Sequence, residues 1–432
     1  MNLADRIALS IINIKNTRVV SELKKLLKSQ SWDRAKLERH QVGRLRKLLD
    51  YAAQNVPYWR EMNLASKVKE GGDAYSMLAD IPVLTKPIIR EQGERIWSEK
   101  ETHYIVATTG GTTGNPLTIR RNYECDAISK AALWRARYVW GVSPSARALY
   151  LKAFGGGTRK GKLKMRLANK MVGEAFPSSD EDVKVITQIM HDFKPVAMEG
   201  YATGLLESVN RSRVKENFKI DVVVSTGEML YPHQRKALEE RYSAKVYTYY
   251  GSNEIGSIAF ECEHNKLHIC EEHVLVETLN EKGQPVINEP GKIVVTDLDN
   301  TAMPFIRYEL GDIAVISDKP CSCGKSSRII SELVGRSQDY LSGSTGRRLQ
   351  ATQLAAYLKD LTQVGQLQFI QTGEDQISLQ YDGKSANAEK EIDMILSHIH
   401  NRLGDQVVVT VDQVAEIPKT NRGKQPLVLR KI

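Results

Sequence analysis

Short apolar runs, each ending in a glycine-bearing turn before a helical pattern, constrain the fold of this chain more than any other feature. Three such runs, each given with the glycines after it, are 148–154 with Gly155, Gly156 and Gly157, 196–198 with Gly200, and 222–224 with Gly227. This alternation predicts parallel strands whose sheet is covered by helices. Ligands of such sheets bind beyond the carboxyl ends of the strands, so these loops are the first candidates for a functional site.

The chain length predicts more than one domain. A single core stops growing at roughly 250 to 300 residues, and this chain has 432. After Gly335 the pattern changes to apolar runs at 368–371, 377–381 and 407–411, a helical pattern at 386–403 and a turn at Asp382-Gly383. We therefore expect an α/β protein: a large domain with mixed or parallel sheets covered by helices at 1–336, and a small mobile α+β domain at 337–432.

The N-terminal third contains a clear helical pattern. Apolar residues recur at spacings of three and four between residues 33 and 52, as on one face of an amphipathic helix that ends before Pro57. The most apolar N-terminal stretch, 7–14, contains Ser10 and Asn13 and is shorter than a membrane span of roughly 20 residues.

Composition indicates an ordinary globular chain. Hydrophobic residues make up 41%, charged residues 26%, and the mean hydropathy is −0.37. Five cysteines are too few for a disulfide scaffold, which favours a reducing compartment and, by default, the cytoplasm.

Basic residues exceed acidic ones and concentrate in two tracts. The net charge is +9, and the tracts are 15–47 and 159–170. Such tracts are either solvated faces, or contacts with nucleotide or coenzyme A phosphates, or contacts with an acidic membrane or glycolipid. No recognised motif predicts a nucleic-acid partner, and the oligomeric state is left open.

A loop rich in glycine and threonine predicts phosphate binding. It comprises Thr108, Thr109, Gly110, Gly111, Thr112, Thr113 and Gly114, followed by Asn115 and Pro116. Its backbone N–H groups and hydroxyls can surround phosphate oxygens. No Gly-Lys-Ser/Thr sequence follows, so a P-loop kinase or GTPase is disfavoured.

This loop and five later motifs, in the same order, resemble the adenylate-forming superfamily of acyl-CoA synthetases and adenylation domains. The five are Tyr249-Tyr250-Gly251-Ser252-Asn253-Glu254, Thr296-Asp297-Leu298, Arg307-Tyr308-Glu309-Leu310-Gly311-Asp312, Gly335-Arg336, and Pro418 to Lys424. Within the superfamily the chain looks most like the phenylacetate-CoA ligase-like branch, which includes capsular polysaccharide biosynthesis proteins. The segments 51–58, Glu199-Gly200-Tyr201 and 304–308 carry this closer resemblance.

The resemblance implies a role for each matched residue. Glu254 offers a hard oxygen ligand for the Mg²⁺ of ATP. Asp312 can accept hydrogen bonds from both ribose hydroxyls, because an ionised carboxylate has two accepting oxygens. Arg336 would reach ribose or phosphate. The other ATP-binding residues implied are Gly227, Glu228, Tyr249, Tyr250 (stacking near adenine), Gly251, Ser252 and Asn253.

The two predicted catalytic residues are Lys424 and Glu254. Lys424 lies in a glycine-flanked loop near the chain end and would bridge the substrate carboxylate and the α-phosphate. Arg307 and Lys419 are less clear and can be structural. The chain departs from the family at Leu117, where a lysine is usual, at Asn253, where a threonine is usual, and at Gln338, where this branch usually has aspartate.

The cysteines predict a second, structural site. Cys262, His268, Cys321 and Cys323 offer three thiolates and one imidazole, a set that fits tetrahedral zinc. The first two flank an expected hairpin, and His264 and Cys270 are alternative ligands. Unliganded cysteines are the other interpretation.

The expected function is that of an AMP-forming ligase that uses ATP and Mg²⁺ to activate a carboxylic acid and transfers the acyl group to coenzyme A. Transfer to a carrier-protein thiol or a sugar amine in polysaccharide assembly is the alternative, and a non-catalytic nucleotide-binding regulator is a further one. The acid is not identified by the sequence. Candidate pocket residues are Tyr138, Phe154 and Tyr201, with Trp134 and Gly227 as further candidates, and core packing is the competing role for most of them.

Overall fold

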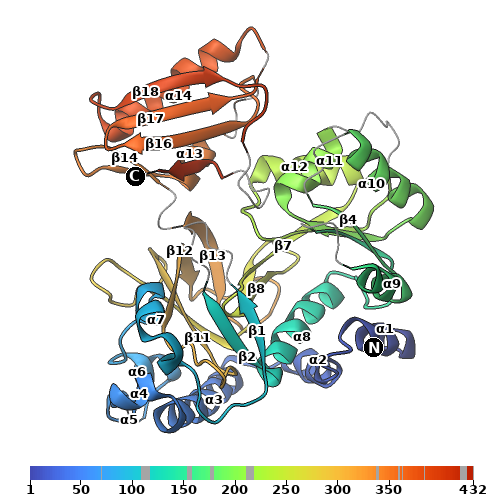
Figure 1. Cartoon of the computed structure of the whole chain (residues 1–432), viewed down its shortest axis with the longest axis vertical. Helices are drawn as coiled ribbons and strands as arrows, with labels where there is room; N and C mark the ends of the chain where they lie inside the picture. Colours follow the sequence, from blue (N-terminus) through green and yellow to red (C-terminus); the bar gives the residue numbers. More distant parts are fainter. Residues whose placement is uncertain are drawn as a thin grey trace.

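The computed structural model describes residues 1–69, 71–108, 117–152, 158–175, 180–210, 218–336, 340–358, 361, 363–383, 385–418 and 426–431. Figure 1 shows a large N-terminal part and a smaller C-terminal part above it.

One eleven-stranded sheet organises the large part. Its strand order is β10-β11-β12-β13-β9-β8-β7-β6-β5-β3-β4. The strands from β7 to β4 are parallel neighbours, and those from β10 to β7 are antiparallel neighbours. The bounds are β3 (Ala148–Lys152), β4 (Lys170–Glu174), β5 (Ala197–Gly200), β6 (Val222–Ser225), β7 (Lys245–Ser252), β8 (Gly256–Glu261), β9 (Leu267–Ile269), β10 (Val274–Leu279), β11 (Pro290–Asp297), β12 (Tyr308–Ser317) and β13 (Ile329–Arg336).

Helices cover both faces of the parallel half, as the strand–loop–helix alternation predicts. Alternate residues of one strand enter different cores: Leu149 and Leu151 pack under helices α10 to α12, whereas Tyr150 packs with α8. Figure 1 shows α10, α11 and α12 on one side of this half and α8 on the other. The helices are α8 (Tyr123–Val139), α9 (Arg159–Leu167), α10 (Asp180–Phe193), α11 (Ala202–Asn210) and α12 (Pro232–Tyr242).

A helical N-terminal segment and one hairpin complete the large part. The predicted amphipathic helix is α3, capped by Asp33 and ending at Asn55, before Pro57 as expected. None of the helices among the described residues has the length and apolar character that spanning a bilayer requires. The bounds are α1 (Leu3–Ile12), α2 (Arg18–Ser29), α3 (Arg34–Asn55), α4 (Pro57–Glu61), α5 (Leu64–Lys67), α6 (Ala74–Leu78), α7 (Lys86–Gln92), the 3-10 helix η1 (Gly93–Ile96), β1 (Tyr104–Thr108) and β2 (Thr118–Asn122).

The C-terminal part is an α+β unit with a hydrophobic core of its own. A four-stranded sheet in the order β18-β17-β16-β19 packs with α14, and the hairpin β14-β15 and α13 adjoin it. The bounds are β14 (Tyr340–Ser342), β15 (Arg348–Gln350), α13 (Ala351–Leu358), β16 (Leu367–Gly373), β17 (Gln376–Tyr381), α14 (Ala388–Leu403), β18 (Val408–Gln413) and β19 (Val428–Arg430). The predicted boundary at 336/337 falls just after β13. We propose that the two parts move as separate domains.

A buried ion pair joins three segments of the large part. Arg307, at φ 49°, donates to both carboxylate oxygens of Glu277 at 3.0 and 3.2 Å and to the carbonyl of Ile81 at 2.6 Å. The two side chains are 6% and 3% exposed. Burial raises the pKa of Glu277, and the neighbouring guanidinium opposes that rise. Arg307 therefore has a structural role, one of the possibilities that the sequence analysis left open: it joins β10 to the segment before α7.

Replacing Arg307 should destabilise the large part strongly. Arg307→Met leaves the Glu277 carboxylate buried without its partner, which costs about 3 to 5 kcal/mol. Urea unfolding followed by tryptophan fluorescence measures this, because all five tryptophans lie before residue 141.

Two control variants make the test specific. Lys25→Met, in the exposed Lys25–Glu22 pair, should change stability by about 1 kcal/mol or less. Arg307→Met/Glu277→Leu should recover part of the loss, since no unpaired charge remains. Equal stability of Arg307→Met and wild type would contradict the structural role.

Candidate active site

The predicted nucleotide-binding motif lies where the sheet changes from parallel to antiparallel pairing. Tyr249 to Ser252 form the end of β7, and Asn253 and Glu254 follow in a turn. Strand β7 pairs in parallel with β6 and antiparallel with β8. The Ser252 hydroxyl accepts a hydrogen bond from the Ile255 amide at 3.1 Å, which fixes the turn. Ligands of open α/β sheets bind beyond the carboxyl ends of parallel strands, and these residues lie at the carboxyl end of β7.

Glu254 is a buried carboxylate with two partners. The Tyr308 hydroxyl donates to its Oε1 at 3.2 Å, and the Lys86 ammonium lies 3.4 Å from the same oxygen. Glu254 is 6% exposed. Its charge is thus compensated by a lysine from the start of α7, which the sequence analysis did not identify.

Tyr250 and Asp312 meet across the sheet. The Tyr250 hydroxyl donates to Asp312 Oδ2 at 2.6 Å, although 62 residues separate them. Asp312 on β12 is also the backbone partner of Arg336 on β13. The structure therefore brings together three predicted ATP-binding positions from different motifs. The side chain of Arg336 lies outside the described residues.

Gly227 follows β6 and permits close packing against Tyr201. Its φ is +73°, and a Cβ there would lie 2.6 Å from a ring carbon of Tyr201. A side chain at residue 227 would therefore require both strain and movement of the ring. Glu228 is the next residue in the same loop, and Tyr249 is nearby, with a hydrogen bond to Thr226 and a pKa raised by burial.

The predicted phosphate loop is carried by the β1-β2 hairpin. Thr108 ends β1 and pairs with Thr118. Leu117, which stands where the family usually has lysine, is buried in the main core. Arg121 on β2 donates to the Asn253 carbonyl and so ties the hairpin to the Glu254 turn. The predicted residues Thr109 to Gly114, Phe154, Lys419 and Lys424 lie outside the described residues.

Cationic and aromatic side chains form a cluster at Glu199, and the sequence analysis did not identify its Arg137, Tyr150 or Lys152. Arg137 donates to Glu199 at 2.6 and 3.1 Å and lies over the Trp134 ring at 4.6 Å. Lys152, whose pKa is lowered by burial, lies 5.2 Å from the Tyr150 ring. Two of its residues had a signal in the sequence: Glu199 lies in the quoted segment before Tyr201, and Trp134 is among the pocket candidates.

Tyr138 has a partner near the N-terminus. Its hydroxyl donates to Asp5 at 3.0 Å, and the Ser145 hydroxyl donates to the same carboxylate at 2.7 Å. Its place in an acid pocket stays a prediction.

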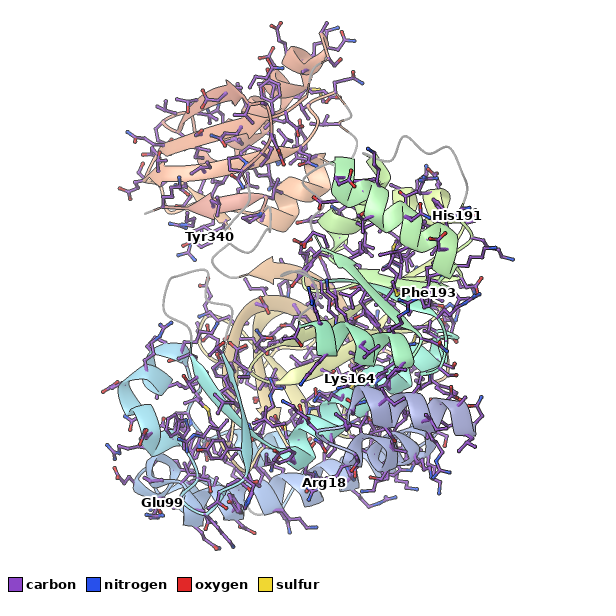
Figure 2. All side chains as sticks on the ribbon, turned by 45° about the vertical axis from the view of Figure 1, so that its right-hand side comes forward. Arg18, Glu99, Lys164, His191, Phe193 and Tyr340 are labelled. Atoms are coloured by element: carbon purple, nitrogen blue, oxygen red, sulfur yellow. The ribbon has the colours of Figure 1, made fainter. Side chains whose placement is uncertain are left out.

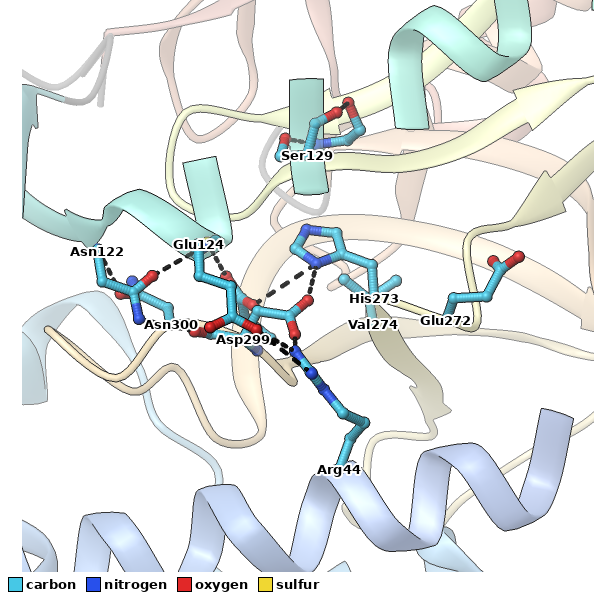
Figure 3. A network of polar contacts seen from close by, with 12 residues as sticks. Arg44, Asn122, Glu124, Ser129, Glu272, His273, Val274, Asp299 and Asn300 are labelled. Carbon is cyan, nitrogen blue, oxygen red and sulfur yellow. Dashed lines mark hydrogen bonds and ion pairs between the residues drawn. The ribbon is translucent and has the colours of Figure 1, made fainter. Parts of the chain in front are cut away.

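A buried polar network around His273 and Asp299 is shown in Figure 3. It adjoins the Thr296-Asp297-Leu298 motif, because the Asp299 amide donates to Asp297 Oδ1 at 3.0 Å. His273 and Asp299 are 2.5 Å apart, and Arg44 reaches from α3 to Asp299. Asn122, at the start of α8, donates to the Asp299 carbonyl at 3.0 Å. Burial lowers the pKa of His273. His273, Asp297 and Asp299 are spaced as metal ligands could be, but the Arg44 guanidinium already supplies the positive charge. We therefore interpret them as an ion-pair network that joins α3 and α8 to the sheet.

The predicted zinc ligands come together at the other end of the β8-β9 hairpin. Ligand atoms of Cys262, His268, Cys321 and Cys323 all lie within 4.8 Å of one another. The Cys262 and Cys321 sulfurs are 3.8 Å apart, which matches the separation of about 3.8 Å expected for two thiolates at tetrahedral Zn–S distances of about 2.3 Å. Cys270 instead lies against Arg135 at 3.5 Å.

His268 is prepared for ligation. Its Nδ1 lies 3.0 Å from the Ser327 hydroxyl, and its Nε2 lies 3.2 Å from the Cys323 sulfur. A hydrogen bond from the ring nitrogen that does not bind the metal, here Nδ1 to Ser327, orients a ligand histidine and fixes its tautomer. Burial, assisted by the positive charge of Lys325, lowers the pKa of His268 to about 4, so the imidazole is neutral near pH 7. We propose that these four residues hold a structural zinc ion.

Comparison with solved structures identifies proteins with the same fold. The fold matches 2-hydroxyisobutyryl-CoA ligase in the postadenylation state with a TM-score of 0.75, at 18% identity, covering 94% of this chain and 91% of that one. The fold is therefore that of the adenylate-forming CoA ligases.

Sequence comparisons indicate which members of this class the chain resembles. The chain is 25% identical to phenylacetate-coenzyme A ligase of Thermus thermophilus over 92% of this chain and 90% of that protein. It is 21% identical to protein CapK of Staphylococcus aureus over 91% and 89%. A family model described as the CapK C-terminal domain matches residues 341–431. The predicted resemblance to the phenylacetate-CoA ligase-like branch, with CapK, is confirmed.

Metal analysis tests the zinc site. The purified chain should contain about one zinc ion, because a set of four ligands closes a structural site. Cys323→Ser should lose most of the metal and unfold at a lower temperature. Inductively coupled plasma mass spectrometry and thermal unfolding measure the two effects.

Cys270→Ala is the matched control, since this buried thiol contacts Arg135 and lies outside the cluster. It should retain the metal. Wild-type protein that takes up no zinc from excess added metal would rule out the site.

Proposed function

We propose that the chain is an AMP-forming ligase that activates a carboxylic acid with ATP and transfers the acyl group to coenzyme A. The observation that carries this proposal is the contact between Tyr250 and Asp312 beside Glu254, where the sheet changes from parallel to antiparallel pairing. These residues come from separate sequence motifs of one superfamily. Relatives that align over most of the chain support the same chemistry.

In the first step, a carboxylate oxygen of the acid forms a bond to the α-phosphorus of ATP, and the bond from that phosphorus to the pyrophosphate oxygen breaks. Asp312 accepts hydrogen bonds from the ribose hydroxyls, and Tyr250 packs near adenine while orienting Asp312. The loop Thr108 to Gly114 surrounds the phosphates. Positioning and charge neutralisation accelerate this step.

Glu254 fits the magnesium ion that accompanies ATP. Carboxylate oxygens are the ligands that Mg²⁺ prefers, and this carboxylate is held in a fixed place by Tyr308 and Lys86. When bound, Mg²⁺ neutralises phosphate charge. Lys86 compensates Glu254 in the free protein.

Lys424 acts from the C-terminal domain. Its ammonium group bridges the substrate carboxylate and the α-phosphate as negative charge accumulates there. The domain then rotates about the segment after Arg336 and withdraws Lys424. In the second step the thiol of coenzyme A attacks the acyl carbon, and AMP leaves.

Acid-dependent ATP–pyrophosphate exchange tests the first step. Over a panel of aryl, aliphatic, hydroxy and amino acids, at least one acid should support exchange. Lys424→Ala should lower the rate by about a hundredfold or more, the usual effect of removing one charge-stabilising group.

Lys431→Ala, which removes an exposed lysine from the same end of the chain, should leave exchange unchanged. Exchange at the wild-type rate in Lys424→Ala would contradict the assigned role. ATP binding without exchange for any acid would favour the non-catalytic regulator. Adding coenzyme A, a carrier-protein thiol or an amino sugar to the active acid then identifies the acceptor by the rise in AMP production.

Asp312 should set the preference for the ribose hydroxyls. Asp312→Asn keeps an acceptor for Tyr250 but lacks the charge, so KM for ATP should rise on the order of tenfold or more. The wild type should prefer ATP over 2′-deoxy-ATP, and the variant should lose most of that preference. Steady-state exchange kinetics with both nucleotides measure this.

Asp318→Asn is the control, because Asp318 is exposed just beyond the same strand and bonds to Asn288. It should behave as wild type. An unchanged nucleotide preference in Asp312→Asn would mean that Asp312 does not contact the ribose.

A further inference from the structure

The first helix presents an apolar stripe that no described part of the protein covers. Leu3, Ile7 and Ile11 recur at spacings of four, so they share one face of the helix, and Ile14 follows in the turn after it. Leu3, Ile7 and Ile14 are 69%, 53% and 68% exposed. The opposite face, with Ala8 and Leu9, is buried.

Helix α9 extends this surface. Leu163 and Leu167, one helical turn apart, are 60% and 67% exposed. No residue of α9 is buried. The helices contact each other, and Figure 1 shows α9 directly above α1. Of the twelve large apolar residues that are exposed among the described ones, five lie on α1, the turn after it, and α9.

Positive charges surround these five side chains. The sequence of α9, RKGKLKMRL, contains five basic residues and no acidic one, and Figure 2 labels Lys164 among them. Arg6 and Lys15 are exposed on and after α1. Asp5, the one acidic residue of α1, is buried and accepts hydrogen bonds from Ser145 and Tyr138. We call this surface, residues 3–15 and 159–167, the apolar-basic face.

We propose that the apolar-basic face docks the protein on an anionic membrane surface. The leucine and isoleucine side chains enter the boundary between headgroups and acyl chains, and the lysine and arginine ammonium and guanidinium groups lie at lipid phosphates. Amphipathic helices with basic flanks bind lipid in this way, and each basic residue near an anionic bilayer adds to the attraction.

The charge pattern separates this partner from others. Two copies of the face would bring like charges together in a symmetric contact, which opposes self-association. Nucleic acid would meet the charges but would leave the exposed leucines and isoleucines without an apolar environment. An anionic bilayer satisfies both groups.

Vesicle sedimentation with the full chain tests the proposal. Vesicles contain either phosphatidylcholine alone or equal parts of phosphatidylcholine and phosphatidylglycerol. The wild type should bind the anionic vesicles and not the neutral ones. Ile7→Asn/Leu163→Asn should weaken partitioning by about tenfold or more, because two apolar side chains lose their burial in lipid. Lys160→Gln/Lys162→Gln/Arg166→Gln should also weaken it.

The matched control is Met394→Asn/Val408→Asn, which replaces apolar residues of the C-terminal part that are 49% and 60% exposed. It should bind as wild type does. Circular dichroism verifies folding, and ATP–pyrophosphate exchange should be equal in all of these variants, so failure of docking and failure of the proposed function are distinguishable.

Two results would overturn the proposal. The first is wild-type binding by Ile7→Asn/Leu163→Asn, since attraction would then be by charge alone. The second is a lack of vesicle binding by the wild type together with concentration-dependent self-association in sedimentation velocity that Ile7→Asn/Leu163→Asn abolishes, since the occupant would then be a second copy of the chain.

Discussion

The pairing of strand β7 determines how the strands of the main sheet are connected and where the Glu254 turn lies. On one side β7 forms a parallel ladder with β6, and on the other an antiparallel ladder with β8. The parallel side requires crossover helices, which cover both faces, and the antiparallel side allows tight connections between strands. The chain therefore leaves β7 at a place where the next strand turns back, and Glu254 occupies that turn.

Buried charges hold the surroundings of this turn. Arg307 and Glu277 join the strands to the segment that leads into α7, and the His273–Asp299–Arg44 network joins them to α3 and α8. Each charge in these networks has an opposite partner or hydrogen bonds, which makes its burial tolerable. At the turn itself, Lys86 forms an ion pair with Glu254, and Arg121 donates a hydrogen bond to the Asn253 carbonyl. Glu254 thus lies in a turn whose surroundings are held by ion pairs and hydrogen bonds within the protein.

The local patterns in the sequence predicted local structure well. Spacings of three and four predicted α3, and the apolar runs before glycine predicted β3, β5 and β6 with their parallel order. Cys262 and His268 flank the turn of the expected β8-β9 hairpin. Side-chain partners that are distant in sequence could not be predicted in this way, because no period or turn signal reports them. Lys86 beside Glu254 and Arg137 beside Glu199 are examples.

The sequence by itself determined which residue types follow each predicted strand and the order of the nucleotide-binding motifs along the chain. Residue chemistry and order identify Glu254, Asp312 and the four Cys and His residues as candidates, since only certain side chains can accept from hydroxyls or bind metals. The tertiary structure decided which of them meet. It placed Tyr250 against Asp312, packed Leu117 into the core, and brought α1, with its exposed apolar residues, against the basic helix α9. The physical reason is that contact and burial depend on how distant segments pack, and packing is a property of the whole sheet and its helices.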